Sequence, residues 1–394
     1  MCLAGHPAPI ELKAAQSSLI EQAMELINAT GMTAGYTMGM EPSGRESIVV
    51  VVKGTFCLPK RGEDVRLHEE QLPLIMADTF TGEPGLSAPR DEVDFAPRKH
   101  RCDILLLGSA HAPNAQAIAR VPVGLRIGNW QKTFAVVGNR HWDAGTTGVC
   151  ASSPDPFITQ PFSYDVAFGG LDARHEDPAK HAAFMLNPVG RGWHKHVNSK
   201  YVDGTSLPNT EELNRPVTAP DGDYAPMSLG PLGRGWASRL QYAGTYDQNW
   251  IDNTFPFLPA DFNEAYYQAA PLDQQIGYPT GGEEVVLMNL TPEGRLSFEL
   301  PKIEVPMVFF RKKGEHHETN AMLDTIAIQP DKRLFTLTWR ASLPLKKNMF
   351  EIPHVLAGKM SRGWWRAREL GKTWYPSLAH LAKANKAASE EETS

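Results

Sequence analysis

Two histidines stand two positions apart in the segment Gly192-Trp193-His194-Lys195-His196. Side chains two positions apart on a β-strand share one face, so His194 and His196 would be placed to bind one metal ion. Such a site would make a metal-dependent hydrolase one alternative function. No third ligand is evident close by, and paired histidines are more often surface or hydrogen-bonded residues. The favoured interpretation therefore contains no metal site.

Other patterns that accompany catalysis are missing from the sequence. His316 and His317 are adjacent, so on a strand they would point to opposite faces and chelate poorly. The sequence contains no G-x-S-x-G elbow of a hydrolase, no G-x-x-x-x-G-K-[ST] phosphate loop and no G-x-G-x-x-G dinucleotide motif. We expect a protein that is not an enzyme, with no catalytic residue and no cofactor.

The triplet Arg-Gly-Trp occurs three times, at 191–193, 234–236 and 362–364. Arg and Trp are the residue types that most often anchor protein interfaces, and glycine beside them lets the backbone approach closely and turn. The alternative is that each Trp packs in a small β core with Arg stacked on it. The triplets thus leave two interpretations open, partner contact and internal packing.

Hydrophobic patterning predicts the elements that would position these residues. β-Branched runs and period-two alternation predict strands at 47–56, 101–109, 123–127, 132–137, 284–290, 295–300, 307–310 and 334–339. Turns are expected at Gly128-Asn129 and at 291–294. In the strand at 334–339, apolar residues alternate with Thr336 and Thr338, which predicts a half-buried strand.

The predicted fold class is mainly β, with two β lobes joined by long ordered aromatic loops and a C-terminal helical tail. Residues 1–24 are an N-terminal extension, and apolar spacing predicts a helix over 11–28. Residues 25–356 form the main domain, with a β lobe at 25–140, a loop-rich middle at 141–280 and a second β lobe at 281–356. The middle should hold brief strands and one short helix near 262–269. Residues 357–394 are a helical tail broken at Pro376, ending in disordered acidic residues from 389.

Composition excludes several classes of protein and of partner. The chain has 394 residues, of which 42% are apolar and 21% charged, with a formal net charge of −6. This excludes global disorder and argues against a nucleic-acid binder. No apolar run approaches the 18–20 residues or so that cross a bilayer, so we expect no membrane insertion. The four cysteines are widely separated, and no signal peptide is visible, so we expect reduced thiols and a cytoplasmic location.

A series of short motifs runs along the chain in a specific order. They are VKGTF at 52–56, DFAP at 94–97, DILLLGSAHAP at 103–113, AFGG at 167–170, NPVGRGW at 187–193, LPN at 207–209, AGTYD at 243–247, LPADF at 258–262, AAPLDQ at 269–274 and GGEEV at 281–285. Their order and spacing resemble the uncharacterised-domain family that is encoded beside type VI secretion genes, next to effectors with PAAR-like tip domains. The resemblance covers about residues 25–310.

The resemblance implies a cytoplasmic adaptor and chaperone. Its partners would be a secreted effector with a PAAR-like domain and the VgrG spike onto which that effector is mounted. It implies no catalytic residues. An exported structural component of the secretion apparatus is a further alternative. We hypothesise that one partner-binding surface is made by Arg191, Trp193, Arg234, Trp236, Tyr246 and Trp250, and a second by Trp364, Trp365, Arg366 and Trp374.

Overall fold

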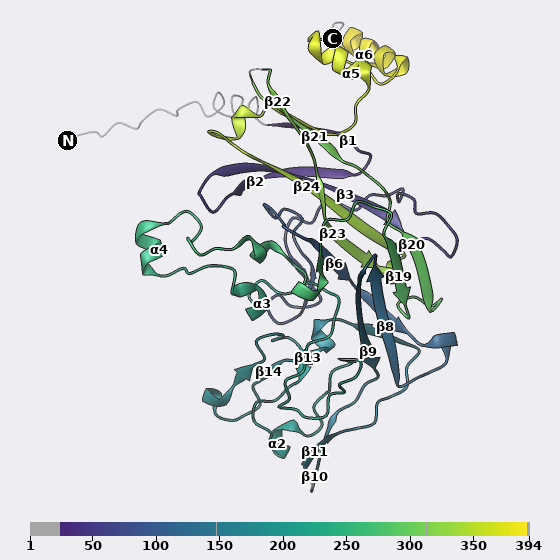
Figure 1. Cartoon of the computed structure of the whole chain (residues 1–394), viewed down its shortest axis with the longest axis vertical. Coiled ribbons are helices and arrows are strands. Elements are labelled where there is room, and N and C mark those ends of the chain that lie inside the picture. The colour runs from purple at the N-terminus through teal and green to yellow at the C-terminus, as the bar shows by residue number, and fades with distance from the viewer. Residues whose placement is uncertain (1–23, 147, 313, 392–394) are drawn as a thin grey trace, which may run out of the picture.

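The computed structural model describes residues 24–146, 148–312 and 314–391. Strands dominate these segments, where they form three sheets of four to six strands together with several two-stranded pairs (Figure 1). The predicted mainly β class is confirmed.

The largest sheet has six strands in the order β18-β6-β23-β24-β3-β2. Its members are β2 (Thr33–Met40), β3 (Glu46–Cys57), β6 (Cys102–Leu106), β18 (Gln275–Ile276), β23 (Met322–Gln329) and β24 (Leu334–Pro344). At its centre β3 and β24 pair antiparallel along the whole of β24. These are the strands predicted at 47–56 and 334–339, where β-branched and aromatic side chains suit a pleated, buried surface.

The second sheet has five strands in the order β17-β9-β8-β19-β20. Its members are β8 (Arg120–Ile127), β9 (Trp130–Val137), β17 (Thr210–Glu211), β19 (Glu284–Met288) and β20 (Arg295–Glu299). The hairpin predicted around Gly128-Asn129 joins β8 to β9, and Ile127 pairs with Trp130 across the turn. The turn predicted at 291–294 joins β19 to β20, where Gly294 donates a backbone hydrogen bond to Thr291.

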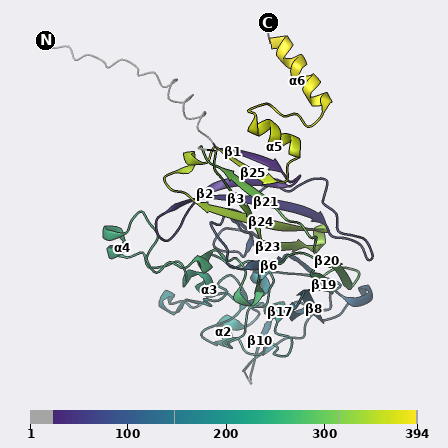
Figure 2. The same ribbon diagram turned by 45° about the horizontal axis from the view of Figure 1, so that its top comes forward.

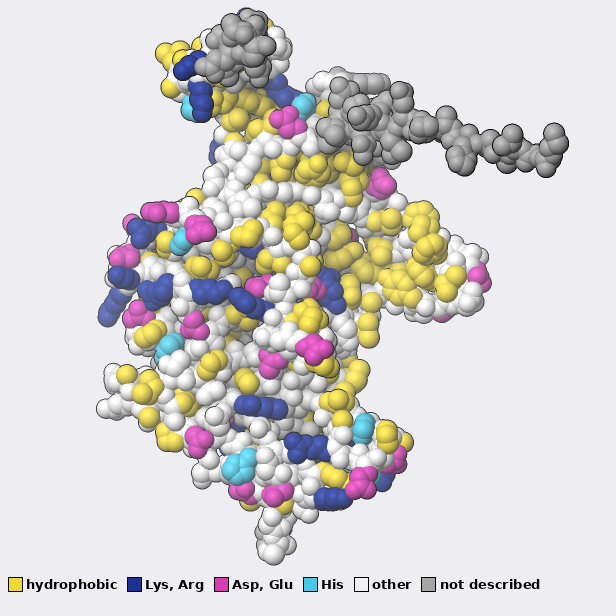
Figure 3. All heavy atoms as spheres, turned by 180° about the vertical axis from the view of Figure 1, so that it is seen from behind, with side chains coloured by type: hydrophobic (Ala, Val, Ile, Leu, Met, Phe, Trp, Pro, Cys, Tyr) yellow, Lys and Arg dark blue, Asp and Glu magenta, His cyan; other side chains and the backbone are white. Residues whose placement is uncertain are grey.

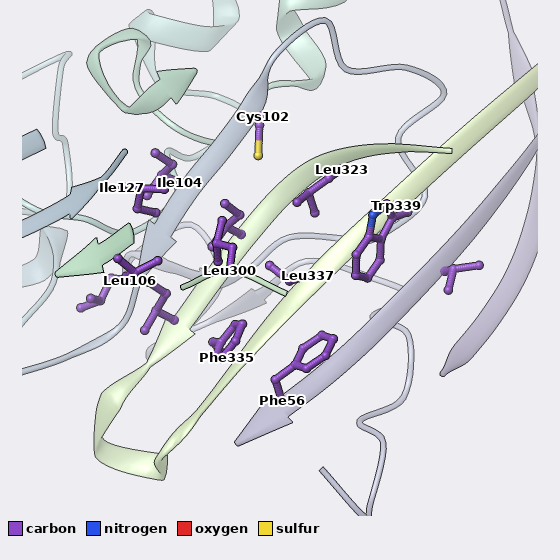
Figure 4. Close-up of a cluster of buried hydrophobic side chains, with 14 of the residues drawn as sticks. Phe56, Cys102, Ile104, Leu106, Ile127, Leu300, Leu323, Phe335, Leu337 and Trp339 are labelled. Carbon is purple, nitrogen blue, oxygen red and sulfur yellow. The ribbon is translucent and has the colours of Figure 1, made fainter. Parts of the chain in front are cut away.

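The apolar faces of the two sheets share one hydrophobic core. Phe56 of β3 stacks on Phe335 of β24 with ring centroids 5.3 Å apart (Figure 4). Phe335 also contacts Phe298 of β20. Strands from 25–140 and strands from 281–356 pair within both sheets. The segments predicted as two β lobes therefore fold around a common core.

The opposite face of β24 is buried as well, so the half-buried pattern predicted for this strand is wrong. Thr336 and Thr338 are both less than 5% exposed. The segment 72–99 covers this face, because Leu72 donates its backbone N–H to Thr55 and Asp94 accepts from Lys53. Threonine alternation marked the polar face correctly, but a distant part of the chain shields that face from water.

The third sheet joins the two ends of the described chain. Its order is β1-β25-β21-β22, with β1 (Glu25–Ala29), β25 (His354–Gly358), β21 (Pro306–Phe310) and β22 (His316–Asn320). The helix predicted over 11–28 is therefore wrong at its C-terminal end, because β1 pairs parallel to β25. The rest of that prediction lies outside the described residues. His316 and His317 fall on strand β22, where neighbouring side chains point to opposite faces as expected.

The remaining strands are short and are connected by loops, and most of them lie in the middle of the chain. The strands are β4 (Thr79–Phe80), β5 (Pro89–Asp91), β7 (Gly108–His111), β10 (Trp142–Gly145), β11 (Gly148–Ala151), β12 (Thr159–Phe162), β13 (Phe168–Gly169), β14 (Leu171–Asp172), β15 (Ala182–Ala183) and β16 (Arg191–Gly192). The helix predicted near 262–269 is a 3-10 turn at Glu264–Tyr267. Three further short helices, α2 (Ser199–Val202), α3 (Ala237–Leu240) and α4 (Gln248–Asn253), were not predicted, because four to six residues carry little helical periodicity.

The C-terminal tail forms two helices, α5 (Arg362–Glu369) and α6 (Leu378–Glu391), with Pro376 in the break predicted between them. Helix α6 continues to Glu391, into the segment predicted as disordered, and 392–394 lie outside the described residues. Helix α5 lies against the third sheet, whereas α6 leads away from it (Figure 2). Trp364 is buried against Phe310, and the Arg368 guanidinium lies 3.7 Å from the centroid of the Phe310 ring.

Because Trp364 carries this contact, Trp364→Ala should release α5 from the sheet. We expect limited proteolysis to cut between the third sheet and α6 at least tenfold faster than in the wild type. The free energy of unfolding of the main body should change by less than about 1 kcal/mol, because only a peripheral element is released. Leu370→Ala is the control, because Leu370 is exposed in the same segment. Equal cleavage rates in both variants would contradict docking through Trp364.

Candidate interaction surface

Charged side chains are built into the polar face of the six-stranded sheet. Lys53 on β3 donates to Asp94 at 2.9 Å, and both side chains are at most 10% exposed. Arg340 on β24 pairs with Asp324 on β23 at 2.6 Å and also donates to the backbone carbonyls of Asp94 and Ala96. These bonds fasten the segment 72–99 to the sheet.

Lys99 extends this set towards the middle of the chain. Its Nζ lies 2.7 Å from Asp103 on β6, and Asp103 also accepts from Gln268 and from the backbone of Ala269. Burial alone would lower the pKa of Lys99, but the carboxylates of Asp103 and Glu92 outweigh burial and raise it. Lys99 therefore stays charged and pairs with Asp103, which in turn holds the segment around 268 against β6.

Glu92 is shared by two arginines from the middle of the chain. Its Oε1 lies 2.6 Å from Arg239 and 2.9 Å from Arg234. Arg234 also pairs with Asp78 at 2.7 Å, and this hydrogen bond holds the Asp78 pKa below its ordinary value although burial alone would raise it. We call the whole set the charge network: Lys53, Lys99, Arg234, Arg239, Arg340, Asp78, Glu92, Asp94, Asp103 and Asp324.

Five cations and five anions of the charge network neutralise one another. A paired, buried charge is a poor nucleophile and a poor general base, because the partner stabilises its charged form. The arrangement is suited to holding distant segments in register on the sheet.

The segment 244–262, which carries helix α4, projects from the body of the protein and is called the aromatic arm (Figure 1). Its base is closed by Asp261, which accepts from the backbone and the hydroxyl of Thr245 at 2.9 and 2.7 Å. Asp247 caps α4 by accepting from Trp250 N. The Trp250 indole donates to Phe257 O at 2.9 Å, which ties the helix to the segment that leads back to the body of the protein.

The arm exposes large apolar side chains. Phe255 is 66% exposed, Ile251 54%, Tyr246 53% and Phe257 47%. Tyr246 and Phe255 each contact Trp250 in an edge-to-face arrangement, with ring centroids 4.8 and 5.5 Å away. Hydrophobic side chains gather over the arm at the right of Figure 3. A contiguous apolar surface of this kind is typical of an interaction site.

The charged groups of the arm are all acidic. Residues 244–262 contain Asp247, Asp252 and Asp261 and no Lys, Arg or His. Next to its base, Arg234, Met76 and Tyr267 line a shallow surface pocket, and Met76 is 73% exposed. The arm therefore combines exposed apolar side chains with acidic residues, and a surface complementary to it would be apolar and basic.

The structure separates the ten residues that were predicted to contact a partner. Tyr246 and Trp250 lie together on the arm, and Arg234 lies beside its base in the charge network. Arg191 instead donates to Asn209, and Trp193 packs half-buried against Phe184. Trp236 is buried against Tyr164 with ring centroids 5.2 Å apart.

In the tail, Trp364 is buried, Trp365 and Trp374 are half-buried against the same small core, and Arg366 is exposed beside Glu369. Sequence reasoning missed Ile251, Phe255 and Phe257. The signal for the two phenylalanines is the apolar run at 255–259, which has no basic residue beside it; Ile251 stands apart from that run.

His194 and His196 do not share a strand face, so that part of the metal-site reasoning is wrong. Strand β16 ends at Gly192; His194 is buried and His196 is exposed. His194 Nε2 lies 3.1 Å from the Thr205 hydroxyl, and its Nδ1 lies 3.7 Å from Asp172. Among the described residues, no group of three or more His, Cys, Asp or Glu side chains is arranged to hold a metal ion.

Burial lowers the pKa of His194 below its ordinary value of 6.5, although Asp172 opposes the shift. The unfolded chain then binds more protons than the folded chain below about pH 6.5, so the free energy of unfolding should fall as the pH drops through that range. His194→Gln should flatten this slope, measured by urea unfolding at pH 5 and 7.5. The exposed His196→Gln is the control; an unchanged slope in His194→Gln would refute the assignment.

In the described part of the chain, no helix is both long and apolar enough to span a bilayer. A family model described as an uncharacterized protein conserved in bacteria matches residues 43–340. The match includes the charge network and the aromatic arm, and it leaves out β1, β2, β25, α5 and α6. Neither the search of curated proteins nor the search of solved structures found a match.

Proposed function

The chain belongs to the DUF2169 family, and on that premise we propose that it is a cytoplasmic adaptor and chaperone of a type VI secretion effector. In this role it binds an effector that carries a PAAR-like domain and helps to load it onto the VgrG spike. The type VI assignment rests on the ordered sequence motifs, whereas the mode of action rests on the aromatic arm.

The aromatic arm is the observation that carries the proposal. Four large apolar side chains stand between about half and two thirds exposed on one projecting segment, a costly arrangement for an isolated protein in water. Aromatic side chains also supply most of the binding energy where they anchor an interface. A partner that covers the arm would remove Phe255 and Tyr246 from water while supplying basic groups to Asp247 and Asp252.

An adaptor of this kind acts by mass action. Binding to the folded effector and not to its unfolded chain stabilises the folded form, and it shields the surface that is meant for the spike. Release requires that the contact with the spike compete with the adaptor for the same surface. A replaceable interface of standard size, roughly 1,200–2,000 Å² in total, suits that exchange.

Co-expression with the effector encoded next to this gene tests the proposal. We expect the effector to be soluble and to co-purify with this protein, and to aggregate when it is expressed alone. Equal solubility and equal delivery of the effector without this protein would refute the proposal. Detection of the protein in the secreted fraction together with the spike would favour the exported structural component instead.

A further inference from the structure

A cavity of about 200 Å³ lies between the polar face of the six-stranded sheet and the segment 72–99. Strand register places Lys53, Thr338 and Thr325 side by side across three strands, and Thr336 and Ala327 side by side in the next row. These residues line the cavity. An engineered cavity of roughly 150 Å³ is large enough to bind benzene, so the space here suits a molecule of at least that size.

Polar groups that can bind a guest line the cavity. Thr336 and Thr338 contribute hydroxyls, on side chains that are 4% and 2% exposed. Glu92 also lines the cavity, and its Oε2 makes no hydrogen bond but lies 3.6 Å from Lys99 Nζ, an ion pair. Lys53 Nζ makes one hydrogen bond, to Asp94, and has further N–H groups to donate. The two hydroxyls and the Lys53 ammonium are therefore free to hydrogen-bond a molecule that enters the cavity.

The buried charges around the cavity are already matched. Lys53 pairs with Asp94, and the remaining members of the charge network are paired in the same way. A charged ligand would bring an uncompensated charge into a buried site, which is strongly unfavourable. Apolar side chains line the rest of the cavity, among them Leu72 and Ile75 from the covering segment and Leu105 from β6.

From these observations we infer that the cavity is a binding site for a small neutral molecule with a hydroxyl group on an apolar body. The hydroxyl interacts with Thr338, Thr336 and Lys53, and the apolar body packs against Leu72 and Leu105. The exposed residues Arg90 and Lys332 mark the side on which the cavity reaches solvent. The site is separate from the aromatic arm, and it stands or falls independently of the adaptor function.

Phenol, toluene and benzoate are the probes that test this site, by calorimetric titration of the full-length protein at millimolar concentrations. Phenol should bind about tenfold more tightly than toluene, because one hydrogen bond to a neutral group accounts for roughly that factor. Benzoate, which is charged, should not bind detectably. Binding of phenol should also raise the unfolding temperature.

Thr338→Val removes one of the three polar partners at nearly constant volume and should lower phenol affinity towards that of toluene, while toluene affinity stays unchanged. Thr159→Val is the matched control, because Thr159 is exposed on β12 and does not line the cavity. If Thr338→Val fails to fold, Thr336→Val serves in its place. Absence of phenol binding, toluene binding as tight as phenol, or unchanged phenol affinity in the threonine variants would each overturn the inference.

Discussion

Arg340→Ala is expected to lower the free energy of unfolding by about 3–5 kcal/mol. Arg340 is 5% exposed, pairs with Asp324 at 2.6 Å and donates to two carbonyls of the segment 94–96. Its removal leaves the Asp324 carboxylate buried without a counter-charge and releases the segment that covers the polar face of β24. Urea unfolding followed by circular dichroism measures the loss.

Two variants separate the buried charge from side-chain truncation in general. Arg366→Ala removes an arginine whose pairing with Glu369 is exposed on both sides, so it should change the free energy of unfolding by at most about 0.5 kcal/mol. Adding Asp324→Asn to Arg340→Ala should recover part of the loss, because the uncompensated charge is then gone. A similar small effect of Arg340→Ala and Arg366→Ala would contradict a structural role for the charge network.

The double variant Tyr246→Ala and Phe255→Ala should weaken partner binding by at least about thirtyfold. This factor corresponds to the roughly 2 kcal/mol that defines a hot-spot residue. Both side chains are more than half exposed, so their removal should leave the free energy of unfolding within about 0.5 kcal/mol of the wild type. Affinity is measured by titrating the purified effector into this protein.

Leu171→Ala is the matched control for the arm variants. Leu171 is also a large apolar residue, 62% exposed, and it lies on β14, outside the arm. It should leave partner affinity unchanged. If the control weakened binding as much as the arm variant, exposed apolar area in general would account for the effect, and the arm would have no specific role.

The strands were predictable because their signal is local. Ile48 to Val52 is a β-branched run, and the alternation of Phe335, Leu337 and Trp339 with threonines marks the two faces of β24. The cover over the threonine face was not predictable, because it comes from the segment 72–99, which has no regular period. Propensity describes a strand, whereas the burial of its second face depends on which distant segment packs there.

The charge network was missed for the same reason. Lys53 and Asp94 are 41 residues apart, and Arg239 and Glu92 are 147 apart, so no spacing rule connects them. One signal was present: Lys53 directly follows four valines, and Asp103 stands inside an apolar run. A charged residue at such a position requires a buried partner.

The Arg-Gly-Trp triplets identified residues that matter for packing but did not distinguish interior from surface. Trp236 and Trp364 point into small cores, whereas Tyr246 and Trp250, which belong to no triplet, lie on the projecting arm. The same chemistry serves both places, because an aromatic ring is buried equally well by its own chain or by a partner. Only the fold shows which of these aromatic side chains are exposed.

Amide hydrogen exchange of this protein, measured alone and in complex with its effector, tests the central claim most directly. The claim is that the chain works by covering an apolar surface of another protein with its aromatic arm. We expect slower exchange across residues 244–262 in the complex and little change at α5 or β14. A stable complex that leaves exchange in 244–262 unchanged would contradict the account.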